Sequence, residues 1–399
     1  MSTETNEYQQ LDELSLEQLL QLHLNCALPS AWTILESHLH GRGLFATRDI
    51  EEGEVIFKDQ ALVLGPRSGT SCPPVCVGCF SSSNPLHPCT LHCRLPVCSS
   101  SCQTSSQHQI ECGFLRAQEG VQTDKAQINW DLLRAVTPLR CLRMSKLKRK
   151  IMKSLESSHF QICEVDLLKR HLHRPLSSSE EAYLRLCCGI LDTNAYGGSG
   201  GGEDNKSLNF RGLYALSAIM NHCCRPNTTY WFDADQRMVV KASSKIKEGE
   251  EILSTYSSLL WGTAMRRSFL RNTKEFECRC LRCKDPTEFG SNLSAIYCKV
   301  KPCPGLLLPS NPLDLKSDWS CTAQATTPFS DHKLSAHKVF PLINIYAKVA
   351  QMLTESEDLA QVDKFLRSVP EFSQPAVQIR KHFVLHSTDE ISGKEPNKL

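Results

Sequence analysis

Cysteine spacing gives the clearest chemical signal in this sequence. Eight potential metal ligands fall in four pairs: Cys76-x-x-Cys79, Cys89-x-x-x-Cys93, Cys98-x-x-x-Cys102 and His108-x-x-x-Cys112. Zinc binds four thiolate or imidazole ligands tetrahedrally, and its binding free energy can stabilise a serine-rich segment too short to build a core. The eight ligands therefore predict two zinc sites, with scattered buried cysteines as the weaker alternative.

A second group of cysteines lies further along the chain. It supplies three ligands at close spacing, Cys278-x-Cys280-x-x-Cys283, and needs a fourth. Three more cysteines follow at Cys298, Cys303 and Cys321. Three cysteines without an evident fourth ligand do not predict a site.

Three sequence motifs follow one another in this part of the chain, and the last contains the second cysteine group. They are Asn221-His222-Cys223-Cys224-Arg225-Pro226-Asn227, then Gly249-Glu250-Glu251-Ile252 with Tyr256, then Phe276-Glu277-Cys278-Arg279-Cys280-Leu281-Arg282-Cys283. They resemble the catalytic end of a SET-domain protein lysine methyltransferase. The cluster from Cys76 to Cys112 interrupts what looks like the front of the same domain, which narrows the resemblance to the SET and MYND domain-containing (SMYD) family. It covers residues 32–284, and the Cys298 to Cys321 spacing is similar to that of the arthropod-type branch.

The resemblance implies how the cysteines pair. A MYND finger would place Cys76, Cys79, Cys98 and Cys102 on one ion and Cys89, Cys93, His108 and Cys112 on another. The family usually has two residues inside its second pair, whereas three separate Cys89 from Cys93 here, so His92 is an alternative ligand. We favour Cys93 because thiolate is the softer zinc ligand. Cys224 would complete the set of Cys278, Cys280 and Cys283, giving three zinc ions.

The resemblance also implies an S-adenosylmethionine site. The Gly41-Arg42-Gly43 turn would hold the methionine end of the cofactor, with His40 and Arg42 flanking its carboxylate, although Gly-x-Gly alone is weak support. Asn221 and His222 would contact the adenine and amino-acid ends, with a satisfied core histidine as the alternative for His222. Asn194 matches a further cofactor contact. Phe276 would pack on the adenine ring, or serve as a core aromatic.

Tyr256 is the residue expected to carry the reaction and to contact the cofactor. Moving a methyl group from a sulfonium to an amine is an in-line displacement that needs alignment, which a hydroxyl and nearby carbonyls can provide through weak C–H···O contacts. A narrow apolar channel beside a sulfonium would lower the pKa of the substrate lysine, so no strong general base is needed. Glu250 and Glu251 are expected to hold the strand turn by hydrogen bonds.

The elements that position these residues follow from periodicity. Leucines at helical spacing predict a short amphipathic helix over 11–24, and short β-branched and aromatic runs predict a small antiparallel sheet from Trp32. Residues 129–174 predict two or three helices, 213–256 predict strands and 331–369 again predict helix. Residues 197–205 are rich in glycine and predict a mobile loop. Residues after 388 are expected to fray.

We expect a zinc-rich α+β protein with a SET-type β fold that is split by a MYND zinc finger and a helical insert. The expected segments are an N-terminal helical segment 1–31, a first SET part 32–70, the finger 76–112, the helical insert 113–180, the SET core 181–260, a post-SET zinc segment 261–290 and a mostly helical C-terminal region 291–399. That last region is short for the family, and the glycine-rich segment lies near the expected substrate groove.

Composition excludes several classes of protein. The 399 residues are 41% hydrophobic, contain no apolar run that could span a bilayer and begin with a polar segment, so we expect no membrane association and an intracellular protein of the cytoplasm or nucleus. Twenty-one cysteines inside the cell favour metal binding over disulfides. A net charge of +2 argues against nucleic-acid binding. Lys146–Lys150 is expected to be a solvated helix face, with an import signal or partner patch as the alternative.

The sequence therefore predicts a monomeric, S-adenosylmethionine-dependent protein lysine methyltransferase that acts on histone or non-histone protein. The alternative is a catalytically weak scaffold that recruits a peptide partner through its finger.

Overall fold

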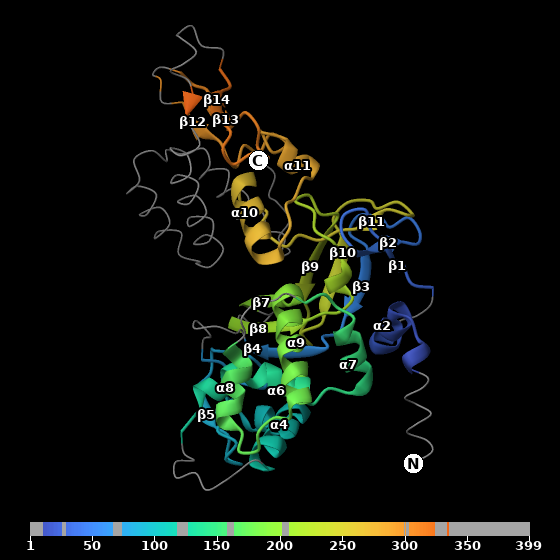
Figure 1. Cartoon of the computed structure of the whole chain (residues 1–399), viewed down its shortest axis with the longest axis vertical. Helices are drawn as coiled ribbons and strands as arrows, with labels where there is room; N and C mark the ends of the chain where they lie inside the picture. Colours follow the sequence, from blue (N-terminus) through green and yellow to red (C-terminus); the bar gives the residue numbers. More distant parts are fainter. Residues whose placement is uncertain are drawn as a thin grey trace, which may run out of the picture. The chain divides into compact units, whose positions relative to one another are not determined.

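The computed structural model describes residues 11–25, 29–66, 74–117, 127–157, 163–201, 207–298, 300, 303–323 and 333–334 (Figure 1). The chain divides into two compact units. Unit 1 comprises Met1–Asn221 and Pro226–Ser254, and unit 2 comprises His222–Arg225 and Thr255–Leu399. The block from Asn221 to Asn227 therefore contributes residues to both units.

Three antiparallel sheets of three strands each make up most of the β structure described for unit 1. The first sheet has the strand order β1 (Trp32–Glu36), β2 (Arg42–Ala46), β11 (Glu251–Ile252). The second has the order β3 (Val55–Asp59), β10 (Met238–Ala242), β9 (Thr228–Phe232). The third has the order β4 (Val63–Pro66), β8 (Ser207–Leu213), β7 (Tyr196–Gly201). Strands β2, β3 and β4 precede the first cysteine cluster, and each pairs with a strand that follows it. One β fold is thus split by an insertion, which confirms the predicted fold class.

The glycine-rich segment is not the predicted loop over its first part. Residues 196–201 form β7, which pairs with β8 and sets Gly198 opposite Phe210. A Cβ on Gly198 would lie 2.4 Å from the Phe210 ring, so glycine allows this ring to pack across the strand. Backbone hydrogen bonds to β8 hold this segment in a strand, although its glycines have no side chains to pack. Residues 202–206 lie outside the described part.

Short elements surround the first cysteine cluster. They are β5 (His87–Pro88), β6 (Pro96–Val97), α3 (Ser100–Gln103) and α4 (Ser106–Ala117). Buried Arg140 connects this region to the rest of unit 1, because its guanidinium donates to the carbonyls of Leu64 (2.6 Å) and Val77 (2.9 Å) and pairs with buried Glu111. The finger is therefore fastened to the sheet by a charged group with several partners.

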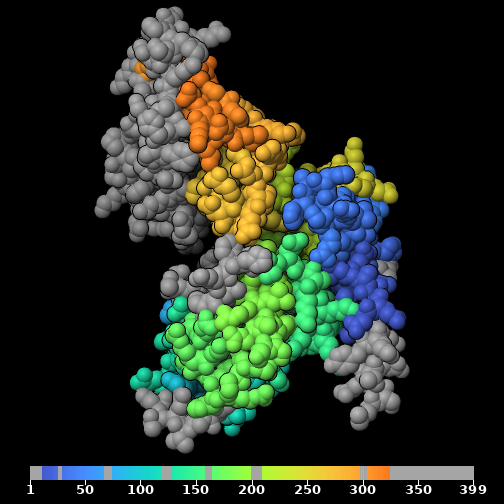
Figure 2. Space-filling model, in the orientation of Figure 1, coloured from blue at the N-terminus to red at the C-terminus, as the bar shows by residue number. Residues whose placement is uncertain are grey.

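In the described part of unit 1, the finger is followed by five helices: α5 (Trp130–Arg134), α6 (Val136–Leu142), α7 (Lys146–Lys153), α8 (Cys163–His171) and α9 (Ser178–Asn194). Four of them lie within 129–174, where two or three were predicted. Helix α9 begins at a capping box formed by Ser177 and Glu180 and continues past the expected boundary at 180. On the face shown in Figure 2, α9 and its neighbours, in green, form part of the surface of unit 1.

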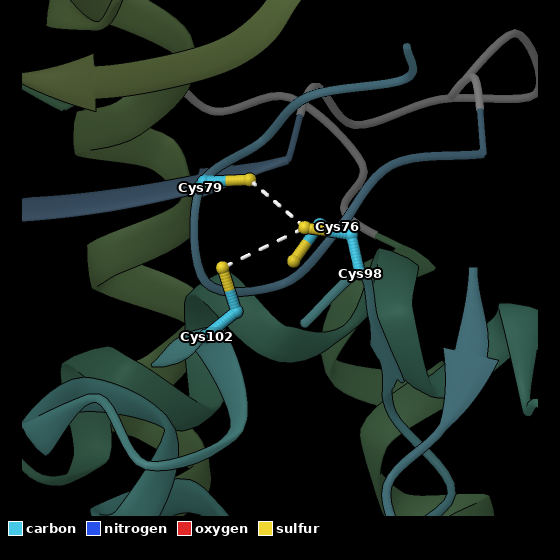
Figure 3. A group of neighbouring side chains, drawn as sticks. All are labelled: Cys76, Cys79, Cys98 and Cys102. Atoms are coloured by element: carbon cyan, nitrogen blue, oxygen red, sulfur yellow. Dashed lines mark hydrogen bonds between the residues drawn. The ribbon is translucent and has the colours of Figure 1, made fainter. Parts of the chain in front are cut away.

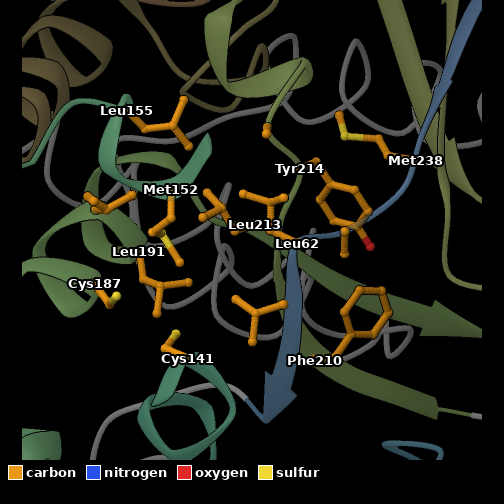
Figure 4. Packing of buried hydrophobic residues seen from close by; sticks show 14 of the residues in the cluster. Leu62, Cys141, Met152, Leu155, Cys187, Leu191, Phe210, Leu213, Tyr214 and Met238 are labelled. Carbon is orange, nitrogen blue, oxygen red and sulfur yellow. The ribbon is translucent and has the colours of Figure 1, made fainter. Parts of the chain in front are cut away.

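The core of unit 1 joins these helices to the sheets. Figure 4 shows side chains from the two kinds of element converging: Leu62, Cys141, Met152, Leu155, Cys187, Leu191, Phe210, Leu213, Tyr214 and Met238. All of them are buried. Burial of apolar area at roughly 25 cal/mol per Å² is the main force that holds the insert against the β fold.

The predicted N-terminal helix is present and packs on the sheet. Helix α2 (Leu16–Leu24) starts at a capping box of Ser15 and Gln18. Glu17 accepts hydrogen bonds from Thr33 Oγ1 at 2.9 Å and from the Ile34 backbone at 3.0 Å. The helix is thereby fixed to β1.

The basic stretch of α7 is not simply a solvated face. Lys148 Nζ donates to the carbonyls of Ala61 (3.4 Å) and Leu62 (3.1 Å), and Lys150 donates to that of Leu11. Burial lowers the pKa of Lys148. These cations satisfy carbonyl groups at the edge of the core, which sequence periodicity does not reveal.

The described residues of unit 2 form two helices and a small sheet. Helices α10 (Thr263–Lys274) and α11 (Leu281–Lys284) are followed by an antiparallel sheet in the order β12 (Ile296–Tyr297), β13 (Leu306–Pro309), β14 (Trp319–Cys321) and β15 (Lys333–Leu334). The described residues between 296 and 334 thus form strands where a mostly helical region was expected. Residues 335–399, with most of the helix predicted over 331–369, lie outside the described part. No helix in the described residues is both long and apolar enough to cross a bilayer.

Candidate functional site

The first four-cysteine set lies where the finger elements meet. Figure 3 shows the side chains of Cys76, Cys79, Cys98 and Cys102 pointing toward one another. The Cys98 sulfur lies 3.6 Å from that of Cys79 and 3.7 Å from that of Cys102. Two thiolates on one tetrahedral zinc ion are ~3.8 Å apart, given a Zn–S bond of ~2.3 Å. The set therefore fits zinc.

The second set contains Cys89, Cys93, His108 and Cys112, all buried. Cys93 Sγ lies 3.3 Å from His108 Nε2, while Nδ1 of this ring lies 2.7 Å from the Gln103 carbonyl. A hydrogen bond from Nδ1 to the carbonyl leaves the Nε2 lone pair facing the sulfurs, which is the arrangement of a zinc-ligating histidine. The structure places Cys93, rather than His92, in this set.

The third set lies in unit 2 and joins distant parts of the sequence. Cys224 comes together with Cys278, Cys280 and Cys283, and its sulfur lies 3.8 Å from Cys278 and 3.5 Å from Cys283. These distances again fit zinc. The arrangement matches the fourth ligand that the resemblance implied.

Two arginines support this third set. Arg282 donates to the Cys224 carbonyl at 3.0 Å, and Arg266 Nη2 lies 3.8 Å from Cys283 Sγ. Both guanidinium groups pair with buried Glu288, at 3.3 Å and 2.6 Å. Positive groups beside four thiolates offset negative charge that a single zinc ion would leave. Sequence analysis did not identify Arg266 or Glu288, because their role depends on pairing across a turn.

Three rings of unit 2 gather next to the third set. The ring centroid of His222 lies 5.3 Å from that of Tyr256 and 5.8 Å from that of Phe276, and Tyr256 and Phe276 are 6.4 Å apart, edge to face. The predicted catalytic tyrosine and the predicted adenine-stacking phenylalanine are therefore neighbours. Lys274 Nζ also lies 5.8 Å from the centre of the Tyr256 ring.

His222 is neutral and has both ring nitrogens in use. Burial lowers its pKa to about 4. The Tyr256 backbone N–H donates to Nδ1 at 3.0 Å, so the ring proton is on Nε2, which lies 3.3 Å from Cys224 Sγ. The side chain is a satisfied buried histidine, the alternative that sequence analysis left open. Only the ring faces and the backbone of His222 remain for a ligand.

Asn221 holds the glycine turn of unit 1. Its side-chain amide donates to the carbonyls of His40 (3.2 Å) and Arg42 (3.1 Å) and to Glu251 Oε1 (2.8 Å). Gly43 permits this close packing, because a Cβ there would lie 2.2 Å from Glu251 Oε1. Glu251 thus helps to hold the glycine turn, and it is Glu250 that caps the strand turn as predicted, because its Oε2 accepts from the Lys247 N–H at 2.9 Å.

Asn227 fixes the strand beside that turn. Its Nδ2 donates to the Glu251 carbonyl at 2.8 Å, and its Oδ1 accepts from the Leu253 N–H at 2.7 Å. No role was predicted for Asn227, although its place in the Asn221–Asn227 block was a sequence signal for one.

Arg42 and Asn194 both donate hydrogen bonds to the same chain segment of unit 1, residues 154–156. Arg42 donates to the Ser154 carbonyl, and Asn194 Nδ2 donates to the carbonyls of Glu156 (2.7 Å) and Ile190 (2.8 Å). The segment 154–156 follows α7 in the helical insert, so no motif pointed to it. The residues predicted to bind cofactor thus form two local groups, one in each unit.

Comparisons with known proteins identify the family of this chain. A profile of the SET domain matches residues 41–257. The SET domain-containing protein SmydA-8 of Drosophila melanogaster is 34% identical over 343 residues in isoform A and 31% over 346 residues in isoform B, covering 84% of this chain and 74% and 76% of those proteins. Histone-lysine N-methyltransferase SMYD3 of Mus musculus is 25% identical over 268 residues, covering 61% of this chain and 59% of that protein. The Drosophila matches agree with the predicted arthropod-type branch. The chain therefore belongs to the SET-domain proteins, and among them to the SMYD family.

Proposed function

We propose that this protein transfers a methyl group from S-adenosylmethionine to a lysine side chain of another protein. Family membership supports the reaction class, since the mouse relative is described as a histone-lysine N-methyltransferase. The observation that carries the proposal for this chain is the grouping of His222, Tyr256 and Phe276, with Tyr256 positioned through its own backbone N–H.

Tyr256 acts through position in this proposal. When bound, S-adenosylmethionine supplies a methyl group on a sulfonium, which an uncharged lysine amine can accept by in-line displacement. The Tyr256 hydroxyl aligns the methyl group, and the protein excludes water so that the substrate lysine is neutral on arrival. Neutral His222 adds no positive charge beside the reacting groups.

Within unit 2, Phe276 offers a ring face for adenine. Within unit 1, Asn221 keeps the His40–Gly43 turn in shape. The predicted contacts of Arg42 and Asn194 with the cofactor stay predictions.

Binding calorimetry with S-adenosylmethionine on the zinc-replete full chain tests the proposal, together with transfer of labelled methyl to a peptide array. We expect about one cofactor per chain and lysine-dependent labelling. Tyr256→Phe should still bind the cofactor but transfer methyl roughly 10–100-fold more slowly. Tyr230→Phe, which removes a hydroxyl from an aromatic cluster of unit 1, is the matched control and should leave the rate unchanged.

The competing function is a scaffold that recruits a peptide through the finger. Failure of folded, zinc-loaded protein to bind S-adenosylmethionine would favour the scaffold and contradict the methyltransferase. Equal rates in Tyr256→Phe and wild type would show that another group aligns the methyl.

A further inference from the structure

Three cysteines outside the sets above come together in unit 2. The sulfurs of Cys298, Cys303 and Cys321 all lie within 4.8 Å of one another. Cys303 and Cys321 are 3.5 Å apart, which is close to the ~3.8 Å spacing of two thiolates on one zinc ion. Sequence analysis predicted no site here for lack of a fourth ligand, but the fold brings together residues that are distant in the chain.

The turn that carries two of these cysteines favours thiolate at one of them. The Cys303 N–H donates to the Val300 carbonyl at 2.8 Å, and the Cys298 N–H donates to the Gly305 carbonyl at 2.9 Å. The Gly305 N–H then donates to Cys303 Sγ at 3.4 Å. A backbone N–H directed at sulfur stabilises the deprotonated form, which is the form that binds metal.

Gly305 also keeps space for the third sulfur. A Cβ at this position would lie 2.3 Å from Cys321 Sγ and 2.8 Å from the Ala323 Cβ. Any side chain there would therefore displace Cys321 or the strand that carries it. The close approach of backbone to sulfur is a built feature of this turn.

Within the described residues, the sheet around these cysteines has only a small core. Its strands are two to four residues long, and its described core consists of Ile296, Leu307 and Trp319, with Cys321 packed against them. Small β structures of this kind are marginal without a metal or a larger core. A bound ion would supply the missing folding free energy.

Apolar packing does not explain why the three thiols meet. Cys141 and Cys187 show the other situation: both are fully buried among apolar side chains, where a thiol packs as a small hydrophobe. Cys298, Cys303 and Cys321 are only partly buried. Their convergence is better explained by a shared ligand than by core packing.

We propose that Cys298, Cys303 and Cys321 bind a fourth zinc ion, with a solvent molecule sufficient to complete the tetrahedron. The ion joins Cys321 of β14 to Cys298 and Cys303 and stabilises the sheet. Because it has three protein ligands with partly exposed sulfurs, this zinc is released before the ions of the four-ligand sets.

Metal analysis of the full-length chain, purified with zinc under reducing conditions, tests the proposal. We expect four zinc ions per chain in the wild type, three in Cys321→Ser and four in Ser320→Ala, the matched control on the same strand. Gly305→Ala keeps all three cysteines but should also bind three, because the added methyl group displaces Cys321. Gly113→Ala should keep four, since a Cβ there meets no atom within 4 Å.

A second measurement on the wild type does not depend on whether variants fold. In stepwise chelation followed by alkylation and mass spectrometry, the first zinc released should coincide with alkylation of Cys303 and Cys321, while Cys76 to Cys112 stay protected. The proposal is overturned by three zinc ions in the wild type, by four in folded Cys321→Ser, by alkylation of Cys303 and Cys321 that is independent of zinc, or by a disulfide between them. None of these results depends on methyl transfer.

Discussion

The backbone N–H of Tyr256 donates to Nδ1 of His222 at 3.0 Å, while Nε2 of the same ring lies 3.3 Å from Cys224 Sγ. One neutral imidazole therefore connects the proposed catalytic tyrosine to a ligand of the third cysteine set. Metal binding and the position of Tyr256 depend on the same side chain.

Replacing His222 should weaken catalysis through this connection. His222→Ala leaves the Tyr256 N–H without its acceptor, which costs roughly 1–3 kcal/mol of unfolding free energy and lowers kcat. His222→Asn restores an acceptor near the Nδ1 position and should recover part of both. Denaturant unfolding, methyl transfer and zinc content, measured together, check this. If both variants retain zinc and have the same kcat as the wild type, His222 does not position Tyr256.

Gly43→Ala should disrupt the turn that Asn221 holds. The added Cβ would lie 2.2 Å from Glu251 Oε1, and relief of that overlap should cost about 1–3 kcal/mol of stability and weaken S-adenosylmethionine binding. Gly113→Ala is the matched control, because its helical site has open space. Thermal unfolding and calorimetry of the two variants make the comparison. Equal behaviour would contradict the role given to the turn.

Zinc content can decide whether Cys93 or His92 is a ligand of the second set. Cys93→Ser should lose one zinc ion and destabilise the finger, because Cys93 Sγ faces His108 Nε2 at 3.3 Å. His92→Ala should keep its zinc, since His92 is a residue of positive φ outside the set. Zinc analysis after dialysis separates the two ligands. Loss of zinc in His92→Ala but not in Cys93→Ser would show that His92 replaces Cys93 as the ligand.

Asp59 should make stability depend on pH. It is fully buried, with Oδ2 accepting from the Ser217 N–H (2.7 Å) and hydroxyl (2.9 Å), and burial raises its pKa from 3.8 to about 7. Between these values the folded state keeps a proton that the unfolded state has lost. Its contribution to stability is thus present at low pH and declines as pH rises from about 4 to about 7, by at most about 4 kcal/mol.

Asp59→Asn should remove this contribution, so the variant gains stability relative to the wild type as pH rises to 8. Urea unfolding of both at pH 5 and pH 8 measures the difference, with exposed Asp235→Asn as the control. A difference between wild type and Asp59→Asn that does not change with pH would mean that Asp59 is ionised throughout.

Much of the local chemistry could be predicted from the sequence. The spacing of the ligand pairs between Cys76 and Cys112 indicated metal binding, because such short intervals bring the two ligands of a pair together in almost any compact turn. Helices such as α2 and α7 followed from the helical spacing of their apolar residues. The family resemblance then supplied groupings that spacing alone leaves open, including the placement of Cys224 with Cys278.

Predictions failed where distant partners decide the outcome. Residues 196–201 contain mostly glycine and favour a loop by propensity, yet they form a strand because β8 offers hydrogen bonds and Phe210 needs the space. Lys148 sits in a basic run, yet it binds core-edge carbonyls.

The sequence by itself determined the ligand types, the paired cysteines of the finger and the order of the SET blocks, since these depend on residue chemistry at short range. Only the tertiary structure decided that both nitrogens of His222 are used internally, that Asn221 spans the glycine turn, and that Cys298, Cys303 and Cys321 meet. The contacts of His222 with Tyr256, of Asn221 with His40 and of Cys303 with Cys321 each require separate chain segments to approach within a few ångströms. The packing and strand pairing of the fold determine that approach.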